Sequence, residues 1–287
     1  MMMRYKYQLG LLILLSLWIS SCHKYEQYPV EFLTKDYVYD SMDQNGDYAK
    51  EVLSQLYTYL PNGYNRIDNV PLGAATDDAI SSANYSDIET LSMSRLNAVA
   101  DNPDGAWYPD YEAIRNVNLF LSHIDVVPVD SVVRQYWKAE ARFIRAINYF
   151  EMMKRYGGVV LVGDKLFSQD DRMTLSRSSF DACVQYVVGE LDDITDSLRP
   201  DPISTADLGR VTQGAALALK ARVLLYAASP LNNTTGDLAK WQKAADAARA
   251  VIDLHQFSLV NDFVSVFTTR QNTEVILAYQ RAQTQDL

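Results

Sequence analysis

Cysteine, histidine, glycine and proline are all scarce in this chain of 287 residues. The two cysteines, Cys22 and Cys183, are far apart in the sequence, which excludes a disulfide scaffold and disfavours a tetrahedral structural zinc site. With 12 glycines, 9 prolines and 48% hydrophobic residues, the composition does not fit a low-complexity disordered protein. The chain is therefore expected to bury a sizeable core, as one large domain or two small ones.

Basic charge is in short supply as well, with 26 Lys and Arg against 36 Asp and Glu and a net charge of −10. An acidic surface repels phosphate backbones, so nucleic acid is disfavoured as a partner. Catalytic patterns are also missing. His23, His123 and His255 are isolated from acidic partners, and the sequence has neither a Gly-x-Ser-x-Gly elbow nor a phosphate-cradling glycine loop. We therefore expect a protein that is not an enzyme and that needs no metal or cofactor.

The apolar run near the start of the chain is too short to cross a membrane. It covers 11 residues, 9–19 (LGLLILLSLWI), whereas a membrane-spanning helix needs roughly 20 residues. Arg4 and Lys6 precede the run, which is the arrangement of a secretory signal peptide.

The residues after this run, Ile19-Ser20-Ser21-Cys22, resemble the bacterial lipobox, in which the cysteine is lipidated and the chain is cleaved just before it. We predict a lipoprotein signal peptide over residues 1–21 and lipidation at Cys22. An ordinary signal peptide followed by an incidental cysteine is the alternative. Since the mature chain is acidic, the anchor has to be lipid and not attraction to an anionic membrane surface.

Residues 22–46 lack helical periodicity and are expected to form the lipidated tether and a loop leading into the domain over 47–287. Apolar residues at spacings of three and four then predict a succession of amphipathic helices. Their expected ranges are 47–60, 104–124, 130–156, from Ser178 or Ser179 to about 198, 212–228 and 238–255. Trp107, Trp137 and Trp241 lie on apolar stripes and are expected in the core. Residues 272–279 are predicted to start a strand or a buried extended segment.

Paired helices with small residues at their crossings predict an all-α, tetratricopeptide-like stack of helical hairpins. The stretch 61–103 interrupts this pattern, because it is rich in Asn, Asp, Ser and Tyr and has no helical period. A loop of this length inside a compact domain is often functional.

Three segments together resemble the SusD/RagB family of Bacteroidetes outer-membrane lipoproteins. They are residues 139–162 (AEARFIRA running into YF and RYGGVVLV), residues 218–232 (ALKARVLLYAASPLN) and the helix with Trp107, Tyr111, Ile114, Asn116 and Asn118. The lipobox and Glu274-Val275-Ile276 fit the family too. The resemblance covers nearly the whole mature chain but only the family's N-terminal half, so the C-terminal half is expected to be missing, through a truncated gene or in a reduced variant.

The resemblance implies a glycan-binding lipoprotein at the cell surface, anchored in the outer membrane. Such a protein captures oligosaccharides and delivers them to a SusC-like TonB-dependent transporter, without cleaving them. In the family, the region that corresponds to 61–103 contributes to the glycan face. Flat apolar rings suit pyranose faces, and amides or carboxylates suit hydroxyls. The predicted glycan contacts are Asp77, Asp78, Asn84, Tyr85 and Arg95.

Two other functions stay open at this point. A tetratricopeptide-type assembly scaffold lipoprotein of the outer membrane, similar to BamD, fits the length and the helices. A glycoside hydrolase is retained only because Asp77 and Asp78 form an acidic loop, although adjacent carboxylates point apart and make a poor acid/base pair.

Overall fold

The computed structural model describes residues 39–61, 63–82, 87–93, 95, 102–172 and 174–280. In these ranges the protein is helical and has no strand. The longer helices are α3 (Asp47–Leu56), α5 (Trp107–His123), α6 (Ser131–Tyr156), α7 (Phe180–Thr195), α8 (Gln213–Ala228) and α9 (Leu238–Asp253). The shorter ones are η1 (Tyr57–Tyr59), η2 (Leu72–Ala75), α4 (Ile88–Ser92), η3 (Ile124–Val126), η4 (Thr205–Asp207) and α10 (Phe263–Thr268). The predicted all-α class is confirmed.

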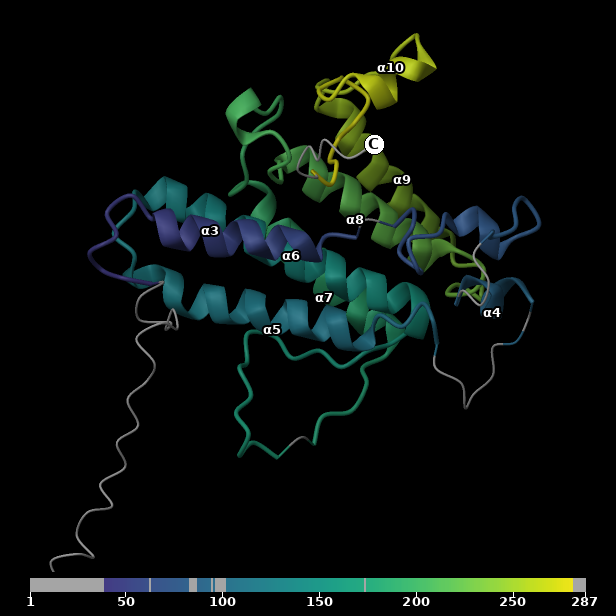
Figure 1. Cartoon of the computed structure of the whole chain (residues 1–287), viewed down its shortest axis with the longest axis horizontal. Helices are drawn as coiled ribbons and strands as arrows, with labels where there is room; N and C mark the ends of the chain where they lie inside the picture. The colour runs from purple at the N-terminus through teal and green to yellow at the C-terminus, as the bar shows by residue number, and fades with distance from the viewer. Residues whose placement is uncertain are drawn as a thin grey trace, which may run out of the picture. The chain divides into compact units, whose positions relative to one another are not determined.

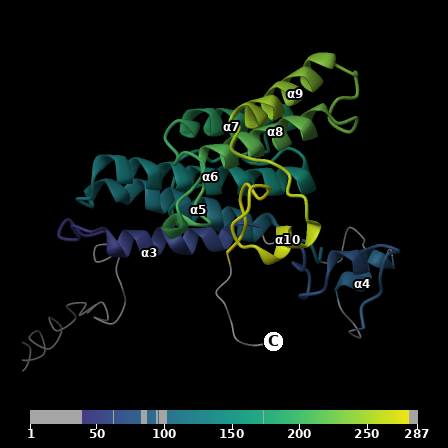
Figure 2. The same cartoon turned by 90° about the horizontal axis from the view of Figure 1, so that it is seen from above.

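From α5 to α9, each long helix packs against the next one in the sequence, and α3 lies against α5 and α6. Figures 1 and 2 show α5 and α6 side by side, with α7, α8 and α9 following in order. This is the hairpin stacking that the periodicity predicts. None of the helices within the described ranges is both long and apolar enough to cross a bilayer.

Helix α6 is the centre of the packing. Fifteen of its 26 residues are buried, so neighbours cover this helix on several sides. The buried side chains include Trp137, Phe143, Ile144, Phe150 and Met152. Glu140 and Arg145 of the same helix are buried as well, with relative exposures of 0% and 1%. A charged side chain buried at such a position needs partners of opposite charge, because removing it from water costs roughly several kcal/mol.

Glu140 finds its partners on segments far along the chain. Its carboxylate accepts a hydrogen bond of 2.6 Å from the Tyr57 hydroxyl and one of 3.2 Å from Arg210, and it also pairs with Arg199. Burial, and next the charge of Glu140, raise the pKa of Tyr57 well above its ordinary value, so the hydroxyl stays a donor. These contacts fix η1 and the segment 199–210 to the middle of α6.

Side-chain caps set the starts of the long helices. Asp130 accepts a hydrogen bond from the Val132 amide at 2.8 Å, Ser179 from Ala182 at 3.2 Å and Thr212 from Ala215 at 3.3 Å. The predicted choice between Ser178 and Ser179 is thus settled in favour of Ser179. The predicted end of this helix at residue 156 is also confirmed, and Gly157 follows it with a positive φ of 71° that glycine adopts readily.

Two of the three tryptophans predicted in the core are not there. Trp137 is buried at 4% exposure, but Trp107 is 39% exposed and Trp241 is 43% exposed. Helix α9 buries only the small residues Ala244 and Ala247, so a bulky ring on its flank remains open. Residues 272–279 form no strand and are at most half-buried, so neither the predicted strand nor the predicted buried segment is found.

Candidate functional site

The stretch predicted as one long irregular loop contains a small core of its own. The described residues between 63 and 95, which we call the lobe, include η2 and α4. Ile67, Ala74 and Ile88 are buried together at the centre of the lobe, and Val70 and Leu72 are among the partly buried side chains packed around them. The lobe is therefore a folded excursion and not an unstructured connection.

The lobe presents polar side chains outward. Asp77 and Asp78 follow η2 and are exposed, and Arg95 is exposed beyond α4. Asn84 and Tyr85 lie outside the described residues. The backbone amide of Asp78 donates to the Thr76 hydroxyl at 3.2 Å, which shapes the turn on which both carboxylates lie. That these residues bind one glycan together stays a prediction.

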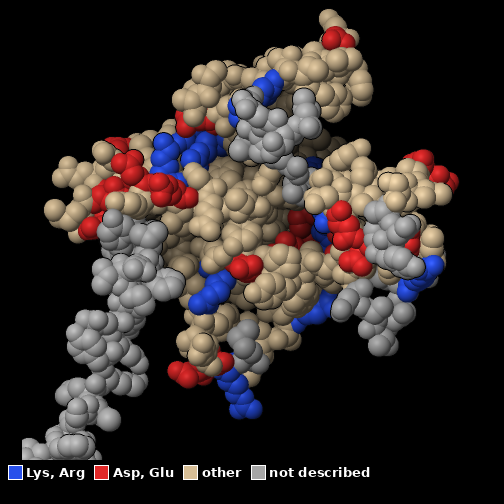
Figure 3. All heavy atoms as spheres, viewed as in Figure 1, with Lys and Arg blue, Asp and Glu red and all other residues tan. Residues whose placement is uncertain are grey.

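A chain of ion pairs ties the lobe to the helices. Arg66 binds Asp104 through two hydrogen bonds of 2.5 and 2.7 Å, and Arg155 of α6 binds the same carboxylate at 3.2 Å. Arg155 also pairs with Glu151 at 2.9 Å. Burial by itself would raise the pKa of Asp104, but the two guanidinium groups outweigh it and lower the pKa. On the face shown in Figure 3, acidic and basic side chains lie next to one another in several such groups.

Beside the start of α5, the structure has an aromatic cleft of about 400 Å³. One wall comes from the first two turns of α5, with Trp107, Tyr108 and Tyr111. The other wall comes from the segment 157–179, by which we mean its described residues 157–172 and 174–179, with Phe167 and Leu175 among its lining side chains. Tyr108 is 77% exposed, so its ring is open to a ligand that enters the cleft.

The aromatic rings of this cleft are held in place by one another and by the backbone. Trp107 meets Tyr111 and Tyr156 edge-on, with ring centroids 5.1 and 5.4 Å away. The Tyr111 hydroxyl donates to the Val160 carbonyl at 2.8 Å and accepts from the Val160 amide at 2.9 Å. Burial raises the pKa of Tyr111 to about 12, so the hydroxyl keeps its proton across the physiological range.

The segment 157–179 is closed at its base, where it leaves α6 and enters α7; in Figure 1 it is the teal loop that extends away from α5. The Ser178 amide donates to the Val159 carbonyl at 2.8 Å, and Arg177 donates to the Gly158 carbonyl at 2.6 Å. A side chain at Gly158 would collide with the Ser178 carbonyl oxygen. Glycine at this position therefore permits the close approach of the two ends.

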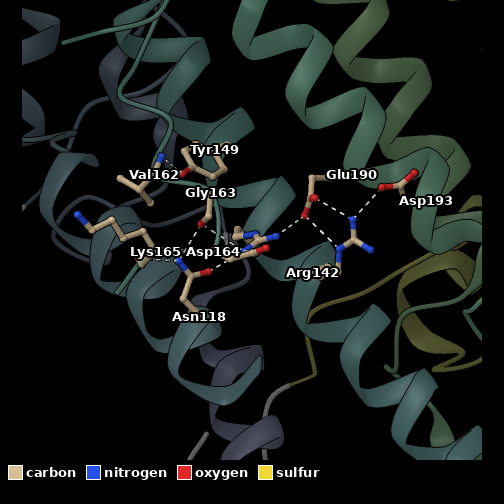
Figure 4. Close-up of polar contacts among 10 residues, drawn as sticks. Asn118, Arg142, Tyr149, Val162, Gly163, Asp164, Lys165, Glu190 and Asp193 are labelled. Carbon is tan, nitrogen blue, oxygen red and sulfur yellow. Dashed lines mark hydrogen bonds and ion pairs between the residues drawn. The ribbon is translucent and has the colours of Figure 1, made fainter. Parts of the chain in front are cut away.

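Further along, the buried side chains of Arg145 and Asn118 hold the segment in place. Figure 4 labels Asn118 and its partners in this network. Arg145 donates to Asn118 at 2.7 Å, to Asp164 at 2.5 Å and to Glu190 of α7 at 2.6 Å. The Asn118 amide donates in turn to the carbonyls of Gly163 at 2.8 Å and Lys165 at 3.2 Å. The second wall of the aromatic cleft is therefore fixed by side chains from three helices.

A second, polar cleft of about 760 Å³ lies on the other side of this network. Arg142 extends the network there, binding Glu190 at 2.8 Å and Asp193 at 3.1 Å (Figure 4). Asp193 is exposed at the rim of this cleft. The cations of this cleft are matched by neighbouring acids, which is the pattern of structural ion pairs between helices.

The comparisons with known proteins agree with this architecture. A family model described as starch-binding and associating with the outer membrane, of the SusD-like type, matches residues 31–225. The chain belongs to the SusD-like family. This confirms the SusD/RagB resemblance expected from the sequence, and with it the tetratricopeptide-like fold.

Individual SusD-like relatives support the same assignment. A SusD-like protein of Bacteroides ovatus is 27% identical over 231 residues, which are 78% of this chain and 41% of the relative. The crystal structure of a SusD-like protein of Bacteroides fragilis matches with 26% identity and a TM-score of 0.64, over 85% of this chain and 45% of that one. A laminarin-binding SusD-like protein has the same fold, with 22% identity and a TM-score of 0.66 over 80% and 50% of the two chains. The chain thus spans half or less of the length of these relatives.

Sequence reasoning missed the aromatic cleft of this SusD-like chain. It placed Trp107 in the core and did not single out Tyr108, although the pattern of aromatic rings at 107, 108 and 111 was a signal. In a helix these positions cannot all face one neighbour, so at least one ring has to point outward. Cys22 lies outside the described residues, so its lipidation stays a prediction. Within the described ranges no group of three or more His, Cys, Asp or Glu side chains is placed to hold a metal ion.

Replacing Arg145 tests whether it fixes the segment 157–179. We expect Arg145→Met to lower the free energy of unfolding by about 3–5 kcal/mol, because Glu190 is left with a partly unpaired charge and Asn118 loses its partner. Trypsin should also cleave sooner after Lys165. The matched change Arg142→Met, at a guanidinium that is 27% exposed, should cost about 1 kcal/mol or less and leave the cleavage rate unchanged. Wild-type stability and cleavage in Arg145→Met would contradict this role.

Asp110, in the first turn of α5, makes stability depend on pH. One of its carboxylate oxygens, Oδ2, is buried without a partner among the described residues. Burial raises its pKa from 3.8 to about 7, while Arg155 acts in the opposite direction and Glu151 adds to the rise. The folded state therefore holds the proton more tightly than the unfolded state, and stability falls as pH rises from about 4 to about 7.

Asp110→Asn should remove this dependence. We expect the variant to gain on the order of 1 kcal/mol at pH 8, with solvent exposure taken into account, and to unfold at a nearly constant denaturant midpoint over this pH range. Denaturant titrations from pH 4 to pH 8 measure both effects. Glu112→Gln, at an exposed carboxylate of the same helix, is the control and should leave the pH profile unaltered. A steeper or unchanged profile in Asp110→Asn would refute the assignment.

Proposed function

We propose that the protein is a cell-surface, lipid-anchored glycan-binding protein of the outer membrane, which captures oligosaccharides and delivers them to a SusC-like TonB-dependent transporter. Membership of a family described as starch-binding supports the glycan part. The likeness in fold to a laminarin-binding SusD-like protein agrees with it. Lipidation at Cys22 would supply the anchor, and the transporter would accept the captured saccharide.

The aromatic cleft is the observation that carries the proposal. A pyranose ring has an apolar face of C–H groups that packs on an aromatic ring, and a rim of hydroxyls that needs hydrogen-bonding partners. Tyr108 and Trp107 offer exposed ring surface in the cleft, and Arg115 and Lys165 lie on the same lining as donors. A volume of about 400 Å³ suits one or two sugar units of a longer chain.

The lobe supplies a second set of contacts in this proposal. Asp77, Asp78 and Arg95 are exposed on the lobe and can accept from or donate to hydroxyls. Tyr64 is 74% exposed there and offers a further ring. Because Arg66 and Asp104 fasten the lobe to the helices, its outward residues are held without a large ordering cost on binding.

Calorimetry with purified protein and a panel of neutral and acidic polysaccharides, laminarin among them, tests the proposal. We expect at least one glycan to bind and Tyr108→Ala to weaken it about tenfold, because the variant loses a stacking surface. Phe263→Ala, at a ring of α10 that is 76% exposed, is the matched control and should bind like the wild type.

Two further variants separate the cleft from the lobe. Tyr64→Ala and the double variant Asp77→Asn/Asp78→Asn remove lobe contacts only. A loss of affinity in these variants, with none in Tyr108→Ala, would move the site from the cleft to the lobe. The absence of binding to every glycan of the panel would overturn the proposed function itself.

A further inference from the structure

All the charged residues that line the aromatic cleft are positive. Of its eleven lining residues, Arg115 and Lys165 carry a positive charge and none is acidic. This stands out in a chain with a net charge of −10. A third cation, Arg177, lies over the outer ring of the cleft, 6.0 Å from the centre of the Trp107 ring.

Both lining cations are positioned and still able to bind a ligand. Arg115 donates from one nitrogen, Nη1, to the Phe167 carbonyl at 2.8 Å. The other N–H groups of its guanidinium can donate to a ligand. The Lys165 ammonium lies over the Phe167 ring at 4.3 Å, and its side chain is 57% exposed. Figure 4 shows this side chain directed away from the Arg145 network, whereas its carbonyl is held by Asn118.

The acids nearby do not cancel this charge. Asp171 approaches Lys165 only at 3.9 Å, a long ion pair, and its other oxygen accepts from the Ser168 amide at 2.7 Å. Asp164 is occupied by Arg145 at 2.5 Å. Arg177 donates hydrogen bonds to the carbonyls of Tyr156 and Gly158, which are neutral groups, so its positive charge remains beside the cleft.

We infer that the aromatic cleft selects saccharides that carry a carboxylate, such as uronic-acid oligomers. Stacked on Tyr108 and Trp107, a uronate ring places its carboxylate at the ring edge, where a guanidinium can bind it with two hydrogen bonds and an ammonium can add a point charge. This inference rests on the proposed function and names the class of glycan that the same site takes.

Hexamers of galacturonate and of mannuronate, each compared with its methyl ester, provide the test. The ester keeps the ring and removes the charge. We expect at least one acid hexamer to bind ten times or more tightly than its ester in calorimetry at low salt. This advantage should shrink as NaCl is raised, because the cations are partly exposed.

Substitution of Lys165 then tests whether the preference for the acid over its ester arises in the aromatic cleft. Lys165→Gln should reduce the preference for acid over ester to less than threefold, and Lys165→Arg should restore it. Lys243→Gln, at an exposed lysine of α9, is the matched control and should keep the full preference. Thermal unfolding of each variant confirms that it is folded.

The two hypotheses fail in different ways. If the esters or laminarin bind as tightly as the acids while Tyr108→Ala still weakens them, the acid selectivity is refuted and the proposed function stands. A preference for acid that survives Lys165→Gln also refutes the assignment to this cleft. If no saccharide of either kind binds, both fall.

Discussion

A single buried guanidinium, that of Arg145, joins α5, α7 and the connection between α6 and α7. Arg145 projects from the middle of α6, is 1% exposed, and binds side chains from α5, from the segment 157–179 and from α7. A buried cation is unfavourable by itself and is tolerated only where its partners are held at the right distance. The partners are therefore constrained as much as the arginine is. This constraint turns a long connection between two helices into a fixed wall.

The same construction explains how a helical stack can carry an open aromatic cleft. Helix packing buries apolar side chains against each other and leaves mainly charged surface outside. Here side chains of the connection between α6 and α7 line a cleft together with Trp107, Tyr108 and Tyr111 of α5, while Tyr108 stays 77% exposed. The lobe adds a polar surface that is tied down through Asp104, which is shared by Arg66 and Arg155. Rigid helices thus hold two exposed regions that have few regular elements of their own.

Much of the scaffold could be predicted from the sequence, because its signals are local. The spacing of apolar residues predicts the helices, and Ser179 and Thr212 mark their starts through caps that reach only three residues along the chain. In α9 only Ala244 of the expected apolar stripe is buried, so the packed face of this helix was predicted less well. The family resemblance likewise depends on short contiguous segments, which can be recognised directly in the sequence.

The site could be predicted only in part, because its contacts join distant positions. Arg145 lies with Lys138 and Arg142 on the basic side of α6, and no local pattern distinguishes the one that is buried. Its partners are 27, 19 and 45 residues away. Trp107 was misplaced for a related reason: a position on an apolar stripe does not show whether the neighbouring segment covers the whole ring. Asp77, Asp78 and Arg95 were expected in an irregular loop, and the small core inside that stretch was not foreseen.

Hydrogen–deuterium exchange with and without a bound saccharide tests most directly that the cleft between α5 and the segment 157–179 captures the ligand. The account predicts slower exchange of the amides of residues 107–111 and 160–167 on binding, with α8 unchanged as an internal reference. Protection confined to the lobe, or spread evenly over the helices, would contradict it.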